Sequence, residues 1–412
     1  MAPATLQTYW PNIIDQMNYR TALLKRNIEL AGMFPFVLLG KIAGKLFKLK
    51  TRHTLFLFYS WADIGGSIQV NIDITNCVKD AKPVIFFTKK PHNNQFRERF
   101  DIEGIRIIDI YKYIDNKFFH FINFFFRGLI ASWINEVENP VVFGGECMFF
   151  YKVLPHVKKE TVTAELNHYK AWFNYSQQFV KDIDYRIFST PQIKRDADTQ
   201  YRANGVPVAY FKNLYFIDNA IEIPPYIPVN NAALEVLFVG RGAPQKRVHL
   251  VAEIARKMKE AKKNIRFTLV GDVEKFIPAD AKEYCRLFGS VSDKNVLNEL
   301  YIQSDVLLLT SLYEGLPIVV MEMMARGKVV VSTAVDGIPD YIKHMENGLL
   351  ITEKEEEKIV LQGVAFFNLL LENNELKEKL GKQSYKDAVA HFGKNKFCNT
   401  YRSILLKEIA PA

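Results

Sequence analysis

The sequence predicts an α/β protein with two domains, each built on a parallel β-sheet covered by helices. At 412 residues and 49% hydrophobic, the chain is too long for one ordinary core and suits two domains of roughly 200 residues each. Short apolar runs alternate with helix-like segments in two series. Between the two series lies a stretch rich in Pro and Asn, residues 218–233, which suits neither a helix nor a central strand.

The first series predicts a domain over residues 54–227. Its runs are near-continuously apolar, as expected for strands buried on both faces of a sheet. The expected strands are TLFLFYS from Thr54, KPVIFFT from Lys82, GIRIID from Gly104, NPVVFGG from Asn139, TVTAEL from Thr161 and YRIFST from Tyr185. Residues 118–134, FFHFINFFFRGLIASWI, are apolar nearly all round. We expect them to pack on this sheet, and contact of some phenylalanines with lipid is the alternative.

The second series predicts a Rossmann-like domain over residues 228–385. Its expected strands are EVLFVG from Glu235, IRFTLVG from Ile265, DVLLLTS from Asp305, KVVVSTA from Lys328 and GLLI from Gly348. Open α/β sheets bind ligands at the carboxyl ends of their strands. Two such domains in series therefore predict a ligand cleft between those ends.

Charge and cysteine usage limit the partners and the compartment. Lys and Arg total 54 against 45 Asp and Glu, a net charge of +9, which suits a polyanion such as a membrane surface, a nucleic acid or a nucleotide. The four cysteines are Cys77, Cys147, Cys285 and Cys398. They are far apart with no paired spacing, so we expect neither a disulfide framework nor a zinc site, and a reducing cytosol fits.

Residues 1–53 form an expected N-terminal extension, which contains MFPFVLLGKIAGKLFKLK from Met33. Lysines interrupt this segment short of the ~20 apolar residues of a spanning helix, so we expect neither a membrane-spanning helix nor a signal peptide. On a helix, one side would carry Phe34, Val37, Leu38, Ile42 and Leu46, and the charges would come from Lys41, Lys45, Lys48 and Lys50. This pattern predicts docking on an anionic membrane surface. The alternative is packing on the first domain.

Two carboxylates follow the strand DVLLLTS in the stretch TSLYEGLPIVVMEMMA, residues 310–325. Pro317 suits a first helical position, and Gly315 lets backbone approach an anion at the helix start. Glu322 lies about six residues beyond the mouth of the helix, ~9 Å along its axis, so together with Glu314 it could bracket a diphosphate. A buried Glu322 needs polar partners. A ribose diol is one, and a Lys or Arg from a neighbouring element is the alternative.

Two cations, Arg241 and Lys246, lie on the loop after the strand EVLFVG. A guanidinium and an ammonium can together neutralise a diphosphate leaving group. The Gly240-x-Gly242 pattern lacks the third glycine of a dinucleotide fingerprint and is followed by Pro244, so we do not expect NAD.

These motifs together resemble the retaining GT-B glycosyltransferases of family 4, the glycosyl transferases group 1. The resemblance rests on the Glu-x7-Glu spacing, the EGLP turn, Arg241 and Lys246, and STAVDGIPDYIKHMENGLLI, residues 332–351. It covers the second domain strongly, and the first only through its strand–helix order and IGGS, residues 64–67. It implies two Rossmann-like domains whose parallel sheets face across a cleft, and a C-terminal helix, 386–412, that returns to the first domain.

The resemblance also implies roles for residues of this sequence. Glu314 would contact hydroxyls of the donor sugar, Glu322 the ribose, and Arg241 and Lys246 the diphosphate, with Glu314 and the two cations counted as catalytic. The rest of the expected donor-binding set is Gly65, Gly66, Gly240, Gly271, Ser290, Val291, Gly315, Leu316 and Pro317. A first-domain histidine that faces the donor sugar is a further catalytic candidate. His168 is the nearest, and Asn167 and Glu165 are its alternatives.

Two acidic triplets, Asp182-Ile-Asp184 and Asp196-Ala-Asp198, have no oxygen-rich cluster beside them, so we expect no metal and no other cofactor. The expected protein is a cytoplasmic glycosyltransferase, peripheral on the inner face of the cell membrane. It would move a sugar from a UDP- or GDP-sugar onto a lipid-linked or glycan acceptor in bacterial surface-polysaccharide biosynthesis, and would not bind nucleic acid. The alternatives are a phosphorylase-type or sugar-phosphate enzyme on the same fold, and a catalytically silent binding module.

Overall fold

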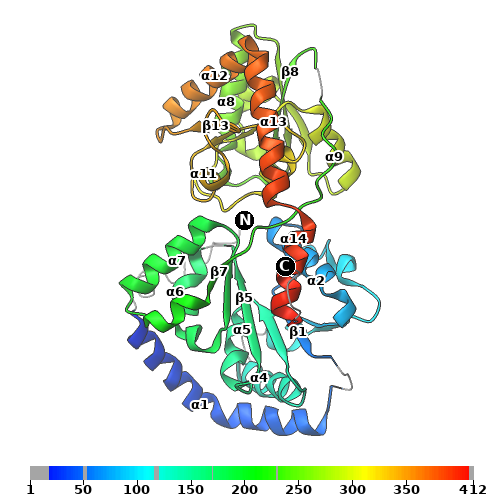
Figure 1. Cartoon of the computed structure of the whole chain (residues 1–412), viewed down its shortest axis with the longest axis vertical. Coiled ribbons are helices and arrows are strands. Elements are labelled where there is room, and N and C mark those ends of the chain that lie inside the picture. The colour runs from blue at the N-terminus through cyan, green and yellow to red at the C-terminus, as the bar shows by residue number, and fades with distance from the viewer. Residues whose placement is uncertain (1–17, 50–52, 116–119, 169, 229–230, 408–412) are drawn as a thin grey trace. The chain divides into compact units, whose positions relative to one another are not determined.

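The computed structural model describes residues 18–49, 53–115, 120–168, 170–228 and 231–407 (Figure 1). Lys50, Phe118 and Phe119, to which the sequence assigned roles, lie outside these ranges. The chain forms two compact units: unit 1 is residues 1–217 with 395–412, and unit 2 is residues 218–394. The first boundary lies before the expected 227 because Asp218 accepts a hydrogen bond from Tyr341 Oη at 2.5 Å and Ile221 N donates to Phe392 O at 3.0 Å.

Unit 1 contains a seven-stranded parallel sheet with the order β3-β2-β1-β4-β5-β6-β7. Its strands are β1 (Leu55–Tyr59), β2 (Val84–Phe87), β3 (Arg106–Asp109), β4 (Val141–Gly144), β5 (Val162–Asn167), β6 (Tyr185–Phe188) and β7 (Leu214–Phe216). The first six form in the apolar runs that predicted strands, and β5 extends one residue beyond its run, to Asn167. The sequence did not predict β7, which has three residues at the sheet edge and an exposed Tyr215.

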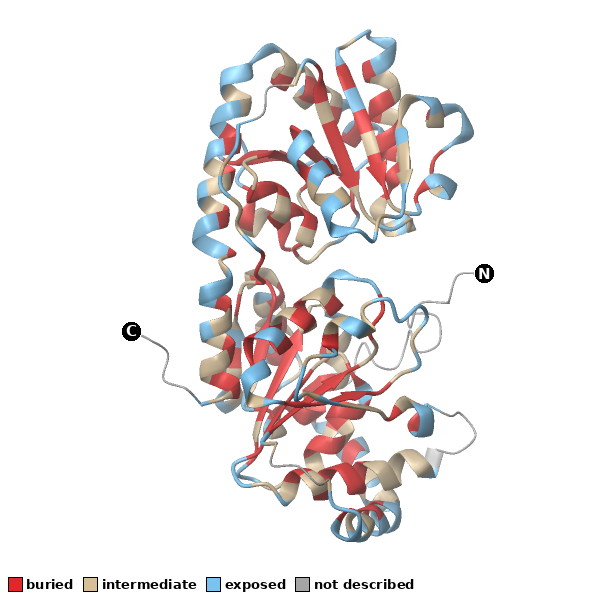
Figure 2. Ribbon diagram, turned by 90° about the vertical axis from the view of Figure 1, so that its right-hand side faces the viewer, coloured by how far each residue is buried: buried red, intermediate tan, exposed pale blue. Residues whose placement is uncertain are grey.

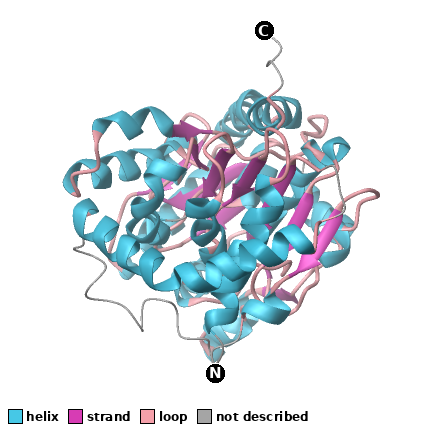
Figure 3. Ribbon diagram, turned by 90° about the horizontal axis from the view of Figure 1, so that it is seen from below, coloured by secondary structure: helices cyan, strands magenta, loops and turns pink. Residues whose placement is uncertain are grey.

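Helices flank this sheet (Figure 3). They are α1 (Tyr19–Leu46), α2 (Gly66–Cys77), α3 (Tyr111–Ile114), α4 (His120–Asn135), α5 (Met148–Val153), α6 (Phe173–Ser176), α7 (Pro191–Ala203) and α14 (Lys394–Leu405). Short 3-10 helices are η2 (Lys79–Ala81), η3 (Arg97–Phe100), η4 (Leu154–His156), η5 (Lys170–Trp172), η6 (Gln177–Asp182) and η7 (Val208–Asn213). Ile130 and Ile134 of α4 join the core cluster around Phe58 of β1, so the predicted packing of this aromatic helix on the sheet is confirmed.

Helix α1 is longer than the sequence suggested and is long and apolar enough, by length and composition, to cross a membrane. It packs along α4 (Figure 1). A Cβ added at Gly40 would collide with the carbonyl oxygen of Phe125, and one at Gly128 with that of Val37, so glycine permits this close backbone approach. The assignment of Val37 to the outward side is therefore wrong: Val37 is buried against α4.

Unit 2 contains a six-stranded parallel sheet with the order β10-β9-β8-β11-β12-β13. Its strands are β8 (Leu234–Val239), β9 (Ile265–Val270), β10 (Arg286–Gly289), β11 (Val306–Leu309), β12 (Val329–Thr333) and β13 (Gly348–Ile351). The strands of both sheets are largely buried (Figure 2). The sequence missed β10 as a strand because it is a partly exposed edge strand with a register shift between Leu287 and Gly289.

The helices of unit 2 are α8 (Val248–Glu260), α9 (Lys294–Gln303), α10 (Ile318–Met324), α11 (Ile338–Tyr341), α12 (Glu356–Glu372) and α13 (Asn374–His391), with the 3-10 turns η8 (Pro244–Lys246), η9 (Glu274–Phe276) and η10 (Ala279–Tyr284). In each unit the strand order reverses once, between β1 and β4 in unit 1 and between β8 and β11 in unit 2. Ligands of open α/β sheets bind outside the carboxyl ends of the strands at such switch points. The loops after these four strands are therefore the places to look for a site.

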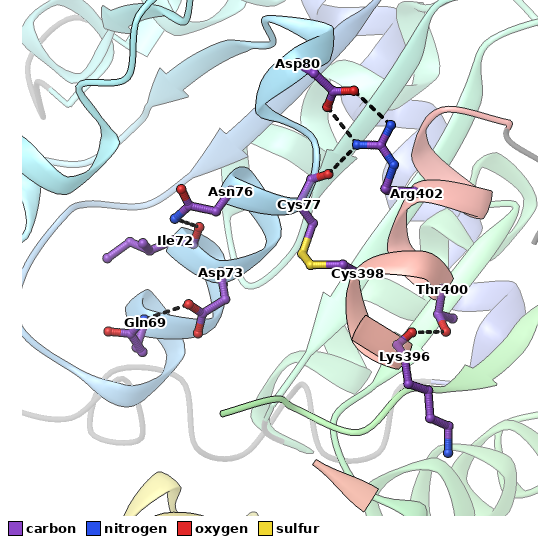
Figure 4. The surroundings of a disulfide bond; sticks show 10 residues. All are labelled: Gln69, Ile72, Asp73, Asn76, Cys77, Asp80, Lys396, Cys398, Thr400 and Arg402. Atoms are coloured by element: carbon purple, nitrogen blue, oxygen red, sulfur yellow. Dashed lines mark hydrogen bonds and ion pairs between the residues drawn. A yellow bond between two sulfur atoms is a disulfide. The ribbon is translucent and has the colours of Figure 1, made fainter. Parts of the chain in front are cut away.

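A disulfide joins Cys77, the last residue of α2, to Cys398 in α14, across a sequence separation of 321 (Figure 4). Beside it Arg402 donates to both carboxylate oxygens of Asp80, at 2.7 and 2.8 Å, and to the Cys77 carbonyl at 2.8 Å. The expectation that the cysteines do not pair is thus wrong for Cys77 and Cys398. The spacing was uninformative because the last helix returns to unit 1 only after the whole of unit 2.

Candidate functional site

Lys246 and Glu314 are brought together at the switch point of unit 2. Lys246 ends η8 in the loop after β8, and Glu314 lies in the loop after β11. The Lys246 Nζ and a Glu314 carboxylate oxygen form an ion pair, with side chains that are 14% and 9% exposed. The sequence assigned these residues to the diphosphate and to the donor sugar separately, and gave no sign of their direct contact.

Arg247 links the two loops through hydrogen bonds and was not among the predicted site residues. It is buried, takes a left-handed backbone conformation with φ 44°, and stands at the N-cap of α8. Its guanidinium donates to the carbonyls of Thr310 at 2.7 Å and Ser311 at 3.0 Å, and Thr310 Oγ1 donates back to the Arg247 carbonyl at 3.0 Å. A buried guanidinium that donates its hydrogen bonds to backbone carbonyls fixes the geometry of a loop. Arg247 therefore also fixes the position of Lys246, the residue before it.

Gln245 and Asp336 complete the support of Glu314. Leu312 N donates to the Gln245 carbonyl at 2.8 Å, and Gln245 Nε2 donates to the Tyr313 carbonyl at 2.6 Å. Asp336, from the loop after β12, accepts the Glu314 N–H at 2.9 Å. Glu314 is therefore held between three loops. The sequence feature that could have identified Asp336 is its place in STAVDG, three residues after the end of β12.

Close backbone approach explains the glycines at the ends of β8 and β9. Gly271 has φ +128°, and a Cβ there would collide with the Gly240 carbonyl oxygen. A Cβ at Gly242 would collide with the carbonyl of Asp272, whose carboxylate accepts the Gly242 N–H at 2.8 Å. Arg241, which lies between Gly240 and Gly242, is exposed and makes no ion pair with any described residue. Its guanidinium is thus available to an anion at this edge of the sheet.

The remaining predicted donor-binding residues of unit 2 lie on neighbouring loops. Ser290 is exposed and Val291 is half-buried directly after β10. Leu316 is buried, so its side chain is not open to a ligand. Pro317 is the N-cap of α10 and Ile318 is the first helical residue, one position later than predicted. Gly315 precedes them in the turn.

Glu322 lies on α10 and forms an ion pair with Arg326 at 2.5 Å. Arg326 also donates to Asn298 Oδ1 at 2.6 Å and lies over the Tyr301 ring, 5.2 Å from its centroid. Burial raises the pKa of Glu322 above its ordinary value although the Arg326 charge opposes the shift. The sequence left open a ribose or a Lys or Arg from a neighbouring element. The structure shows an arginine, but Arg326 follows α10 itself, four residues after Glu322. The ribose contact stays a prediction.

In unit 1, the switch point carries the Gly65–Gly66 turn after β1. Both glycines are exposed, and Gly65 is the N-cap of α2. A Cβ built on Gly65 meets nothing within 4 Å, and its φ of 167° is ordinary extended backbone. Among the described residues, no contact thus requires glycine at position 65, and the open space leaves room for a ligand's close approach.

His168 directly follows β5 and contacts Glu146, which the sequence analysis did not select. The His168 N–H donates to Glu146 Oε1 at 2.7 Å, and its Nδ1 lies 3.5 Å from Oε2. Glu146 follows β4, and its carbonyl accepts a hydrogen bond from Ser60 Oγ at 3.2 Å. The sequence feature that could have identified Glu146 is its place directly after Gly144 and Gly145, at the end of a buried strand.

The two alternatives to His168 are core residues. Glu165 is fully buried and paired with Arg186, and Asn167 is also fully buried. The His168 side chain is 11% exposed. Among the three candidates, His168 is therefore the one that a ligand at the surface of unit 1 can reach.

Each carboxylate of the acidic triplets has a partner within unit 1. Asp182 pairs with Arg26 at 2.7 Å, Asp184 accepts the Thr163 N–H at 2.9 Å, Asp196 pairs with Lys170 at 2.8 Å, and Asp198 pairs with Arg202 at 2.7 Å. In the part of the chain that the structure describes, no group of three or more His, Cys, Asp or Glu side chains could hold a metal ion. Metal independence remains a prediction.

Comparisons with known proteins cover unit 2 by sequence and nearly the whole chain by structure. Residues 222–387 match the family model of glycosyl transferases group 1. An N-acetyl-alpha-D-glucosaminyl L-malate synthase of Bacillus anthracis is 26% identical over 145 residues, 32% of this chain and 37% of the relative. The amylovoran biosynthesis glycosyltransferase AmsK of Erwinia amylovora is 29% identical over 139 residues, 31% of this chain and 34% of the relative. The chain thus spans less than half the length of these curated relatives.

Solved structures agree over a longer stretch. TarM superimposes with a TM-score of 0.67 at 13% identity, over 86% of this chain and 99% of TarM. HepE of Anabaena, in complex with UDP-glucose, gives a TM-score of 0.66 at 13% identity, with the same coverage. The chain is thus a protein of the GT-B fold. Its segment 222–387, which contains Lys246, Glu314 and Glu322, matches the family model of the glycosyl transferases group 1.

Proposed function

We propose that the protein is a retaining glycosyltransferase that moves a sugar from a nucleoside diphosphate sugar to a glycan or lipid-linked acceptor. The observation that carries this proposal is the contact of Lys246 with Glu314 at the switch point of unit 2. A cation and a carboxylate side by side can bind the diphosphate and the sugar hydroxyls of one donor molecule. The family match over 222–387 supports the assignment.

The cations of the site suit a reaction with a diphosphate leaving group. Negative charge grows on the diphosphate as the glycosidic bond breaks, and preorganised cations stabilise it. Arg241 is exposed, whereas the charge of Lys246 is compensated by Glu314. A diphosphate oxygen would therefore compete with Glu314 for Lys246, and Glu314 would be freed for a donor hydroxyl. Two cations at the site support a reaction without metal.

The proposed donor is a nucleotide sugar. HepE was solved with UDP-glucose, which supports a nucleotide-sugar donor, and UDP- and GDP-sugars are the two classes proposed. Gly271, Ser290 and Val291 would form the walls around the base. In unit 1, Gly65 and Gly66 would approach the diphosphate, and His168 would face the sugar with its backbone fixed by Glu146.

The proposed setting is the assembly of a bacterial surface polysaccharide at a membrane. AmsK is by name an amylovoran biosynthesis glycosyltransferase, which supports a role in bacterial surface-polysaccharide assembly. We place the protein in the cytoplasm at an anionic membrane surface, where a lipid-linked acceptor would be found. A reducing cytosol keeps most thiols reduced, so this location implies that Cys77 and Cys398 are thiols in the cell and form their disulfide only under oxidising conditions.

The test is a thermal-shift screen of UDP-, GDP- and ADP-sugars, followed by detection of free NDP and of the new linkage. Ligand binding to the native state raises the melting temperature with occupancy, so one donor class should stabilise the protein and release NDP. NMR of the product should show the donor's anomeric configuration. Sugar phosphate without free NDP would point to a phosphorylase-type enzyme. Donor binding without turnover on any acceptor would point to a binding module.

A further inference from the structure

Helix α1 has two different faces. Its inner face is built from Ala22, Arg26, Val37, Gly40 and Gly44, which are buried in unit 1. Its outer face consists of Leu24, Ile28, Leu38, Leu39, Ile42 and Leu46. These six side chains are between 43% and 74% exposed. Their spacing of three and four residues, continued by Ala31 and Pro35, places them in one stripe.

Paired charges fix the inner face to unit 1. Arg26 is 3% exposed and pairs with Asp182 at 2.7 Å, and it donates to the Gln178 carbonyl at 2.8 Å. Glu29 pairs with Arg127 of α4 at 3.1 Å and with Lys152 of α5. Insertion of α1 across a bilayer would break these pairs and leave ionic groups without partners, which is strongly unfavourable. The helix therefore stays on the body of unit 1 and presents its outer face.

Aromatic residues extend the apolar surface beside the outer face. Phe34 of α1 is 61% exposed. Phe36 stacks on Phe121 of α4 with ring centroids 6.1 Å apart, and both rings are partly exposed. Phe47, directly after the helix, is 72% exposed. Exposed apolar surface that is continuous over two helices marks an interaction site.

Lysines predominate among the charges around the C-terminal half of this surface. Residues 30–49 contain three lysines and no Asp or Glu. Lys45 and Lys48 are exposed, and Lys48 lies 3.8 Å from Glu136, its nearest carboxylate. Lys25 is exposed farther along the helix. An apolar stripe flanked by lysines matches the acyl and headgroup layers of an anionic bilayer.

We infer that the outer face of α1, with Phe34 and Phe47 beside it, docks unit 1 on an anionic lipid bilayer with the helix axis parallel to the membrane plane. A second copy of the chain is a poorer occupant, because a two-fold contact of this face with itself would oppose lysines to lysines without a carboxylate. The inference does not depend on the proposed transfer reaction, so either can fail without the other.

The experiment is co-sedimentation of the full chain with vesicles of pure phosphatidylcholine and of an equal mixture of phosphatidylcholine and phosphatidylglycerol. Wild type should bind the anionic vesicles and be released by high salt, since screening removes the lysine contribution. Leu39→Glu/Leu46→Glu on the stripe and Lys45→Glu/Lys48→Glu beside it should each weaken binding by roughly tenfold or more. Val208→Glu is the matched control, because Val208 is 73% exposed on η7 of unit 1 and should bind like wild type.

The variants must melt like wild type, which their exposed positions predict. The inference is overturned if the stripe variant binds like the Val208 control. It is also overturned if wild type resists alkaline extraction and needs detergent, as a spanning helix would. Sedimentation equilibrium without vesicles tests whether a second copy of the chain occupies the outer face. A wild-type dimer that Leu39→Glu/Leu46→Glu dissociates would assign the face to a second copy instead of a bilayer.

Discussion

Lys246 and Glu314 form an ion pair across the loops that follow β8 and β11, the two neighbouring strands at which the order of the unit 2 sheet reverses. Arg247, the residue after Lys246, stabilises the arrangement because it donates to two carbonyls of the loop that carries Glu314. A site with this much support before ligand arrives is preorganised for charge stabilisation. The Glu314 carboxylate and an incoming diphosphate would nevertheless use the same ammonium group.

Glu314→Gln should separate nucleotide binding from donor binding. The substitution removes the carboxylate that occupies Lys246, so we expect NDP affinity to stay the same or rise. It also weakens the contact with sugar hydroxyls, so NDP-sugar affinity should fall roughly tenfold. Isothermal titration of both ligands measures this, with the exposed Glu346→Gln as the control. An equal loss for NDP and NDP-sugar would show that the assigned role of Glu314 is wrong.

Glu322→Ala should weaken binding of NDP without any sugar attached, because the proposed contact is with the ribose. Arg326→Met should act mainly on stability, since it leaves the partly buried Glu322 carboxylate without its partner at 2.5 Å. The expected cost is roughly 1–3 kcal/mol. Chemical denaturation and NDP titration of the two variants distinguish these effects. The ribose role is contradicted if Glu322→Ala binds NDP as tightly as wild type.

The Cys77–Cys398 disulfide should stabilise unit 1 by constraining the unfolded chain. A loop of 321 residues places the expected contribution at the upper part of the usual range, about 4 kcal/mol. Reductant should lower the melting temperature of wild type and leave that of Cys398→Ser unchanged. Arg402 and Asp80 should keep α14 attached in that variant. Identical melting of wild type with and without reductant would show that the disulfide does not form in solution.

His156 should make unit 1 sensitive to acid. Burial, and after it the charges of Lys41, Arg127 and Arg26, lower the pKa of His156 from 6.5 to about 4, and Glu29 opposes the shift weakly. As the pH falls through 6.5 the unfolded chain takes up this proton first, so a stabilising contribution present above pH 6.5 is lost toward pH 4. The full loss is roughly 3 kcal/mol. Urea unfolding between these pH values should show a smaller loss for His156→Gln, and parallel curves would contradict the assignment.

Much of the fold was predictable because buried parallel strands are near-continuous apolar runs. All the strands expected from such runs form, whereas β7 and β10 were missed because short, partly exposed edge strands carry no such run. On α1 the helical period was predictable, but the side that faces inward was not. Gly40 and Gly44, rather than a hydrophobic side chain, mark the face on which α4 packs, and this placed Val37 on the wrong side.

The candidate site was predictable in composition and not in its contacts. Lys246 and Glu314 could be selected because each follows a strand, but their pairing depends on which strands are neighbours in the sheet. In the sequence, Arg247 looks like a further surface cation after Arg241 and Lys246. Its left-handed backbone conformation instead directs the guanidinium to the carbonyls of Thr310 and Ser311. Glu146 was missed because its contact with His168 joins the ends of two strands that are neighbours in the sheet but separated by an intervening helix in sequence.

Release of free NDP in the presence of EDTA tests the central claim most directly. With the donor that stabilises the protein most, wild type should release NDP at a rate that EDTA does not change. Lys246→Met should lower that rate by roughly 10²-fold or more, because Lys246 would stabilise charge on the leaving diphosphate. Release by Lys246→Met at the wild-type rate, or its abolition by EDTA with rescue by Mn²⁺, would contradict a metal-independent transferase that works through this site.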